Sequence, residues 1–113
     1  MPYIETKTTR KIGKAEAAEL RERLGKAIEL IPGKTDKWLM LSFRGELDMA
    51  FAGVDGDAAM IEVDILGHAD DSSYAALTAK ICEIMSDVLA LPKDRIYVKY
   101  TEFDRWGWNG INL

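Results

Sequence analysis

Apolar side chains alternate with polar ones in three segments of the chain, residues 2–8, 58–67 and 95–103. Alternation with a period of two is typical of a β-strand that has one covered face. Residues 38–43 are apolar almost throughout, which predicts a fourth strand, covered on both faces. A short additional strand at 49–51, before a glycine-containing turn, fits the same pattern. The pattern therefore predicts a sheet of four long strands.

Two other segments carry apolar residues at intervals of three and four, the period of an amphipathic α-helix. The first covers 14–29 and ends at Pro32-Gly33; the second follows the N-cap candidates at 70–73 and ends before Pro92. The apolar stripes consist of Leu20, Leu24, Ile28 and Ile31 in the first helix and Tyr74, Leu77, Ile81, Ile84 and Val88 in the second. Each helix is thus predicted to bury one side.

The same order of elements occurs twice in the chain. A helix, a proline, a short turn with basic residues and a strand follow one another at 27–43 and again at 88–100. This repetition predicts two strand-helix-strand units in tandem, whose crossovers make parallel strand pairs and place the helices on one face. We expect an α/β (α+β) fold whose other sheet face is covered by further copies of the chain.

Composition narrows the class of protein. At 113 residues the chain is expected to form a single domain, 1–113. A net charge of −4 and no basic run longer than two residues argue against nucleic acid or an anionic membrane as partners. The single cysteine, Cys82, excludes an intramolecular disulfide and is expected to be a packed thiol. Without the roughly 18 apolar residues of a membrane span or the core of a signal peptide, we expect a cytoplasmic protein, with leaderless export left open.

Pro2 is the main candidate for chemistry. It is small enough for Met1 to be removed routinely, which would make Pro2 a free secondary amine at the head of a strand. A primary α-amine has a pKa of about 8, and desolvation favours its neutral, proton-accepting form. The proline ring also gives the nitrogen a fixed direction. Proline is nevertheless a common second residue, so Met1-Pro2 alone does not distinguish a base from an ordinary N-terminus.

Other polar and aromatic residues have ordinary structural explanations. Glu62 and Asp64 share one face of a predicted strand, where a solvated or subunit-facing surface is favoured over an acid/base pair. His68, the one histidine, is expected in a loop. The C-terminal segment 106–113 is too aromatic to be left in water, which predicts a packed or functional tail.

Four features in register resemble one known family. They are the N-terminal Met-Pro strand, the two tandem units, the run Leu-Pro-Lys-Asp-Arg-Ile-Tyr-Val at 91–98 and the closing Gly-Trp-Asn at 107–109. Together they resemble the macrophage migration inhibitory factor branch of the tautomerase superfamily over the whole chain. The resemblance implies a four-stranded mixed sheet with two helices on one face, assembled as a homotrimer around a central channel. It also implies keto-enol tautomerisation of small α-keto acids such as phenylpyruvate, without a cofactor or metal.

The resemblance further implies roles for individual residues. Pro2 would transfer a proton between the substrate carbon and the enzyme as general base and acid. Lys34 would bind the substrate carboxylate, and Ile65 and Leu66 would contact the substrate at a strand end. Tyr97 would reach the pocket of a neighbouring subunit and form part of its aromatic wall. Taken without the resemblance, Lys34 is an ordinary solvated lysine.

The remaining implied site residues include two departures from the family pattern. Trp108 and Asn109 match the tail motif, and Tyr3 flanks the pocket by position. Lys99 stands where asparagine is usual and would add positive charge near the pocket. Trp106 replaces a small aliphatic residue at the rim. We therefore expect a narrower mouth and a changed preference among aromatic substrates.

Missing motifs limit the chemistry, and one alternative function stays open. Residues 57–61 lack the Cys-x-x-Cys motif of the family's best-known member, so thiol-disulfide chemistry is not expected. Residues 67–70 lack the arginines used by relatives that dehalogenate or decarboxylate haloacrylate-type acids. The altered rim also suits a receptor-binding, cytokine-like protein with a vestigial pocket. In either case Met1, while retained, would abolish the basicity of the Pro2 nitrogen.

Overall fold

The computed structural model describes residues 1–113, which form one four-stranded sheet, two α-helices and two small hairpins. The sheet strands are β1 (Pro2–Thr8), β2 (Met40–Arg44), β5 (Ala59–Leu66) and β6 (Ile96–Phe103). The helices are α1 (Lys14–Ala27) and α2 (Asp71–Leu89). The hairpins are β3 (Ala50–Phe51) with β4 (Val54–Asp55), and β7 (Gly107–Trp108) with β8 (Ile111–Asn112). Short 3₁₀ turns are η1 (Ile28–Leu30), η2 (Asp36–Trp38) and η3 (Lys93–Arg95).

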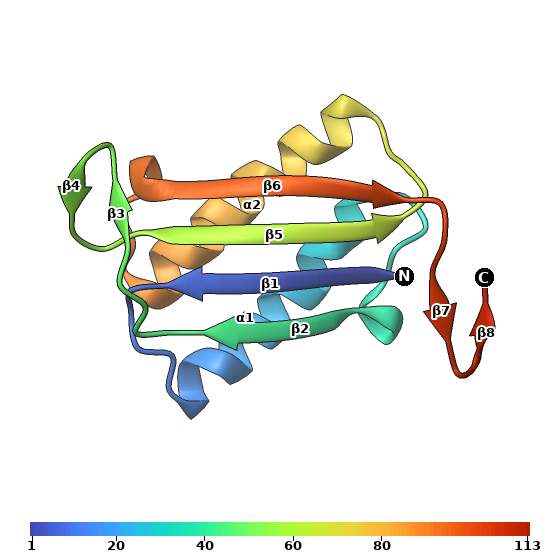
Figure 1. The fold of residues 1–113 in the computed structure, drawn as a ribbon, viewed down its shortest axis with the longest axis horizontal. Coiled ribbons are helices and arrows are strands. Elements are labelled where there is room, and N and C mark those ends of the chain that lie inside the picture. Colours follow the sequence, from blue (N-terminus) through green and yellow to red (C-terminus); the bar gives the residue numbers. More distant parts are fainter.

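Two strand-helix-strand units lie side by side in the sheet (Figure 1). In the first unit β1 pairs in parallel with β2, and in the second β5 pairs in parallel with β6. The units meet where β1 pairs antiparallel with β5, which gives the strand order β2-β1-β5-β6. The predicted fold class, a mixed four-stranded sheet made of tandem units, is confirmed.

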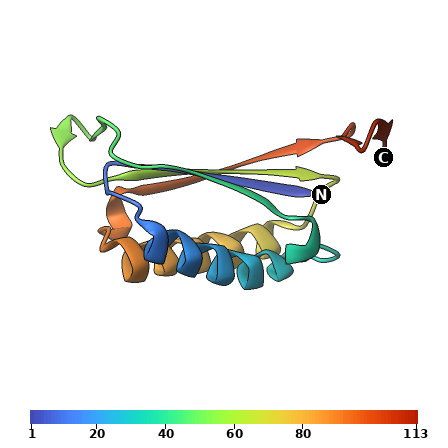
Figure 2. The same ribbon diagram turned by 90° about the horizontal axis from the view of Figure 1, so that it is seen from below.

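Both helices cover the same face of the sheet (Figure 2). Because side chains alternate along each strand, every second residue of β1 and β5 points into the layer between sheet and helices. The fully buried residues of this layer include Ile4, Ile61, Val63 and Ile65 from the strands and Leu20, Leu24, Leu77 and Ile81 from the helices. Burying one such side chain stabilises the fold by about 1.5–3 kcal/mol. Neither helix is long and apolar enough to span a membrane.

The prediction for 38–43 is partly wrong. Trp38 belongs to η2, and β2 begins at Met40. β2 is also not covered on both faces, since it contains no buried residue and Met40 is 67% exposed. The reason is that both helices lie on one face of the sheet and leave the other face of β2 open, while its position at the sheet edge exposes it further. The short strand expected at 49–51 is present as β3.

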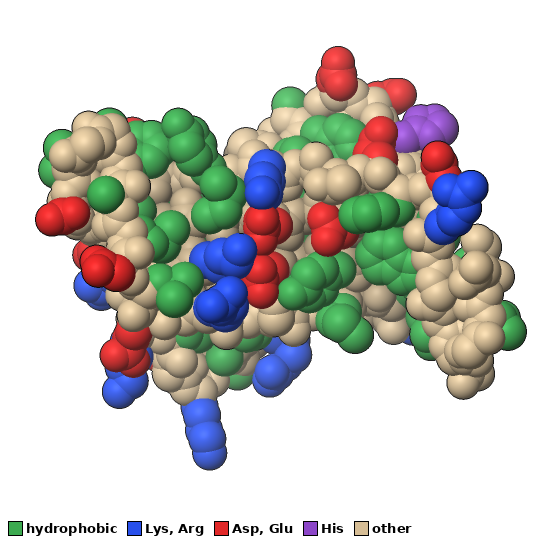
Figure 3. All heavy atoms as spheres, in the orientation of Figure 1, with side chains coloured by type: hydrophobic (Ala, Val, Ile, Leu, Met, Phe, Trp, Pro, Cys, Tyr) green, Lys and Arg blue, Asp and Glu red, His purple; other side chains and the backbone are tan.

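Charged side chains gather in the middle of the uncovered sheet face (Figure 3). Glu62 lies 2.8 Å from Lys99 and 3.0 Å from Lys7, and Lys7 lies 3.4 Å from Glu5. Hydrogen bonds from Lys99 and Lys7 lower the pKa of Glu62 to about 2. Burial, followed by repulsion from Glu62, raises the pKa of Asp64. Glu62 is thus a doubly paired carboxylate, which does not suit a proton-transferring group.

Substitution by valine should have opposite effects on stability at two threonines on the buried face of β1. Thr6 Oγ1 is buried without a hydrogen-bond partner, whereas Thr8 Oγ1 donates to the Ala58 carbonyl at 2.8 Å. We expect Thr6→Val to raise the free energy of unfolding by about 1 kcal/mol, because it removes an unsatisfied polar group at nearly constant shape. Thr8→Val should lower it by about 1–2 kcal/mol. Urea denaturation measures the free energy of unfolding of both variants. Equal losses of stability would contradict the difference in hydrogen bonding between the two threonines.

The ion-paired Glu62 predicts a pH dependence of stability. Its folded-state pKa of about 2 lies below the ordinary value of 4.5, so the carboxylate contributes stability above pH 4.5 that is lost as the pH falls toward 2. In Glu62→Gln, the free energy of unfolding should therefore fall less steeply across this window than in the wild type. Glu83→Gln, which removes an exposed ion pair of 3.4 Å with Lys80, is the matched control. Identical slopes in both variants would refute the assignment.

Candidate active site

A largely apolar cleft of about 800 Å³ opens at the end of the sheet where β1 begins. Three segments far apart in sequence line it: residues 1–3, residues 37–42 and residues 106–108. They come together because β1 begins between the start of β2 and the end of β5, and the tail hairpin follows directly from β6, the strand next to β5 (Figure 1). The cleft is therefore built from the N-terminus, the entry to β2 and the C-terminal tail.

The N-terminus is held at this place by backbone pairing. Pro2 is buried and lies opposite Ile65 in the β1–β5 ladder. The amide of Leu66 donates to the Met1 carbonyl at 3.1 Å, which continues the ladder by one residue. Lys34 Nζ donates to the Leu66 carbonyl at 2.7 Å. The fold thus gathers the first two residues, Leu66 and Lys34 at one point.

The α-amine in this place has a strongly shifted pKa. Desolvation by burial, the positive charge of Lys34 and a hydrogen bond with Lys34 lower the pKa of the Met1 amine from 8.0 to about 6. At neutral pH the amine is therefore mostly unprotonated and able to accept a proton. In this structure Met1 precedes Pro2, so the Pro2 nitrogen is a peptide nitrogen and the free amine belongs to Met1.

Three tryptophans form the aromatic wall of the cleft. Trp38 and Trp108 meet edge to face, with ring centroids 5.1 Å apart, and Lys37 Nζ lies 5.4 Å from the centroid of the Trp38 ring. Trp106 packs edge to face on Phe103 at 5.8 Å. The sequence pattern does not predict Trp38 as a site residue, because it places this residue in a strand. Its position beside a second indole depends on the turn η2, which the apolar pattern does not reveal.

Tyr97 and Lys99 do not reach the cleft of their own chain. Tyr97 pairs with Met60 near the start of β5, whereas Pro2 pairs with Ile65 near its end. Five residues at ~3.3 Å each separate these positions by roughly 17 Å. Tyr97 is 57% exposed, and Lys99 lies on the uncovered face in its ion pair with Glu62.

The other expected site residues differ in how they face the cleft. The Ile65 side chain is fully buried in the core on the same face as its cross-strand partner Pro2, and it does not line the cleft. Tyr3 lines the cleft, and its hydroxyl lies 2.6 Å from Ser42 Oγ. Asn109 and Gly110 have φ values of 52° and 80° in the turn between β7 and β8. This geometry matches a type I′ hairpin turn, for which Asn-Gly is the preferred sequence.

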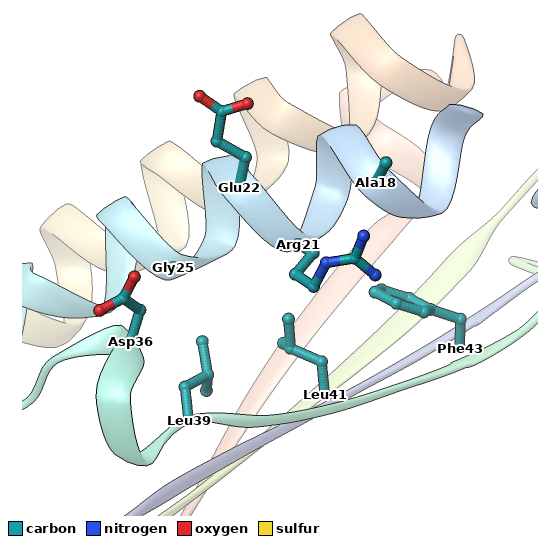
Figure 4. A pocket seen from close by; sticks show the side chains of 8 residues that line it. All are labelled: Ala18, Arg21, Glu22, Gly25, Asp36, Leu39, Leu41 and Phe43. Carbon is teal, nitrogen blue, oxygen red and sulfur yellow. The ribbon is translucent and has the colours of Figure 1, made fainter. Parts of the chain in front are cut away.

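A second groove, of about 430 Å³, runs between α1 and the edge strand β2 (Figure 4). Leu39, Leu41 and Phe43 form its floor, and the Arg21 side chain extends over it toward Phe43. Asp36 closes one end against Gly25, where an added Cβ would lie 3.1 Å from the Asp36 Cβ. The groove has no amine or thiol among its lining residues, so it offers no counterpart to the chemistry of the first cleft.

The sequence matches the model of the family described as macrophage migration inhibitory factor over residues 1–113. The chain therefore belongs to this family, whose members have the tautomerase-superfamily fold. The architecture described above agrees with this assignment, because the structural relatives superpose on nearly the whole chain.

Relatives come from distant organisms. The crystal structure of Leishmania major MIF2 has a TM-score of 0.94 and 26% identity, covering 100% of this chain and 97% of that one. A homologue from Prochlorococcus marinus has a TM-score of 0.88 and 28% identity, covering 97% of each chain. The macrophage migration inhibitory factor of Mus musculus is 24% identical over 95 residues, 82% of this chain and 79% of the mouse protein.

The position of Lys34 beside the N-terminus leads to a prediction for the pKa of the Met1 amine. In Lys34→Met, the pKa of the Met1 amine should rise from about 6 toward 8.0 without reaching it, because burial is the larger cause and remains. The pH dependence of acetylation at the N-terminus, followed by mass spectrometry, measures this pKa. Lys37→Met removes a lysine that lines the cleft but does not contact the amine, so it should leave the pKa unchanged. A raised pKa in the control alone would contradict the assignment.

Proposed function

We propose that this protein is a cofactor-independent keto-enol tautomerase for small α-keto acids of the phenylpyruvate type, with Pro2 as general base and acid. The observation that carries the proposal is the position of the N-terminal amine. It is partly desolvated, lies beside Lys34 and faces a cleft lined by aromatic rings. A base whose pKa is near neutral is well matched to proton transfer at carbon.

Removal of Met1 transfers the amine to Pro2. The new amine would lie one residue further into the structure, where the Pro2 side chain is already buried. Burial and the charge of Lys34 disfavour protonation there, as they do for the Met1 amine. The ring then holds the nitrogen in one direction. Pro2 takes a proton from the carbon next to the substrate carbonyl and returns it to the enol, or the reverse.

Lys34 and the tryptophans divide the recognition of the substrate between them. Lys34 Nζ is positioned by the Leu66 carbonyl and supplies the positive charge that binds the substrate carboxylate. Trp38, Trp106 and Trp108 contact the apolar part of the substrate. The bulk of Trp106 at this wall favours flat or slender groups over large ones.

A homotrimer would complete the site. Tyr97 lies roughly 17 Å from Pro2 along the sheet of its own chain, with an exposed side chain that can reach another subunit. In the assembly that we propose, Tyr97 and Lys99 of one subunit extend toward the cleft of the next. The same assembly would cover the sheet face that the helices leave open.

A receptor-binding, cytokine-like function is the second candidate. The tail hairpin beyond Trp108 exposes Ile111 and Leu113 at 58% and 48%, which gives the chain an apolar surface near the cleft. An unreactive N-terminus together with saturable binding to a receptor of the family's type would favour this function over catalysis. Absence of such binding would remove it.

The tautomerase proposal predicts the behaviour of trimmed and untrimmed protein. Protein whose intact mass shows that Met1 is absent should accelerate ketonisation of phenylenolpyruvate, followed by ultraviolet absorbance. Blocking the amine should lower kcat/KM by roughly 100-fold or more, since general acid-base catalysis contributes about that much. Protein that retains Met1 should be inactive, because the Pro2 nitrogen is then a peptide nitrogen and the free amine of Met1 lies one residue away from the position of the proposed base.

Two variants separate the base from the carboxylate anchor. Pro2→Gly replaces the secondary amine of the ring by a primary amine and should mainly lower kcat, whereas Lys34→Ala should mainly raise KM. Lys11→Ala, on the exposed loop after β1, is the control and should match the wild type. Full activity of Pro2→Gly on every α-keto acid that the wild type converts would refute the mechanism.

A further inference from the structure

Arg95 binds several backbone carbonyls of one small hairpin. It lies at the end of η3, directly before β6. Its Nε donates to the Asp57 carbonyl at 2.8 Å, and its Nη2 donates to the Val54 carbonyl at 2.9 Å. Contacts of 3.4 Å reach the carbonyls of Phe51 and Gly56. The guanidinium thus ties the β3–β4 hairpin and the following turn to the start of β6.

The β3–β4 hairpin depends on these hydrogen bonds because its own strand pairing is short. Its strands β3 and β4 have two residues each, too few for a hairpin that is stable by itself. Ala52 and Gly53 at its tip have φ values of 55° and 75°. This left-handed conformation is unfavourable for a non-glycine residue such as Ala52.

The same guanidinium reaches Tyr97 through one aromatic ring. The Arg95 Cζ atom lies 5.6 Å from the centroid of the Phe51 ring. The Phe51 ring in turn packs edge to face on Tyr97, with ring centroids 4.8 Å apart and planes at 62°. Tyr97 is 57% exposed, so Phe51 is a main constraint on its ring.

We propose that Arg95 is a positioning residue that orients Tyr97 through Phe51. The inference rests on the proposed function, in which Tyr97 extends toward the cleft of a neighbouring subunit. Arginine is suited to this task because its planar fork donates to several carbonyl oxygens at once, while its charge lies within cation–π distance of the Phe51 ring. Lysine at the same position would keep the charge but lose the fork.

The orientation of Tyr97 can be tested without reference to activity. The chain has four tyrosines, so fluorotyrosine labelling gives few fluorine resonances, and Tyr97→Phe assigns that of Tyr97. In Arg95→Lys, the Tyr97 resonance should shift toward the value of a solvated tyrosine, while those of Tyr3, Tyr74 and Tyr100 stay in place. Lys93→Ala, on an exposed neighbour in η3, should move none of them. An unchanged Tyr97 resonance in Arg95→Lys would overturn the inference.

Phe51→Leu is a second variant in case Arg95→Lys does not fold. It keeps the backbone carbonyls that Arg95 binds but removes the ring between Arg95 and Tyr97. The same shift of the Tyr97 resonance is expected. No shift would mean that Phe51 does not transmit the restraint, which would also overturn the inference.

A double-mutant cycle tests the consequence for catalysis. Arg95→Lys should lower kcat/KM about tenfold in the wild-type background and less than twofold in the Tyr97→Ala background, because coupled residues are not additive. Equal losses in the two backgrounds would show that Arg95 acts by stabilising the fold in general, which refutes a positioning role. A trimmed wild type without activity would refute the proposed function, and the fluorine resonances would still decide whether Arg95 orients Tyr97.

Discussion

The antiparallel pairing of β1 with β5 is the contact on which both the fold and the cleft depend. It joins two strand-helix-strand units that otherwise contain only parallel pairs of their own. The register places Pro2 opposite Ile65, so the N-terminus lies at the end of β5 rather than in solvent. A slip of one residue would turn every side chain of β1 to the other face and expose Ile4. The buried face of β1 therefore fixes the position of the amine.

Electrostatics differ sharply between the cleft and the uncovered sheet face. Lysines at the sheet face pair with Glu62, so charge there is neutralised locally. Lys34 has a carbonyl as its partner, and its charge remains available to depress the pKa of the neighbouring amine or to attract an anion. The same residue type thus supports folding in one place and chemistry in the other, because the partners differ.

The sequence pattern predicts the long elements well and the cleft only in part. Strict alternation identifies β1, β5 and β6, since each has one face on the core. The pattern fails at 38–43, because an apolar edge strand has the same composition as a buried one and the turn that holds Trp38 has no signature. It also cannot place Tyr97 relative to Pro2, since periodicity defines a strand but not its register with a neighbour. The sequence pattern does not predict the role of Arg95, because the partners of this side chain are backbone carbonyls.

The hydrogen bond from the Leu66 amide to the Met1 carbonyl has a consequence for the processed chain. Cleavage of Met1 removes the acceptor and leaves a backbone donor beside the new amine. Such a donor, near Lys34, is costly to leave without a partner where water is excluded. In the proposed enzyme, an oxygen of the bound substrate can accept this hydrogen bond. Removal of Met1 would therefore do more than free a nitrogen: it would turn one rung of the β-ladder into a hydrogen-bond donor that is free to bind a ligand.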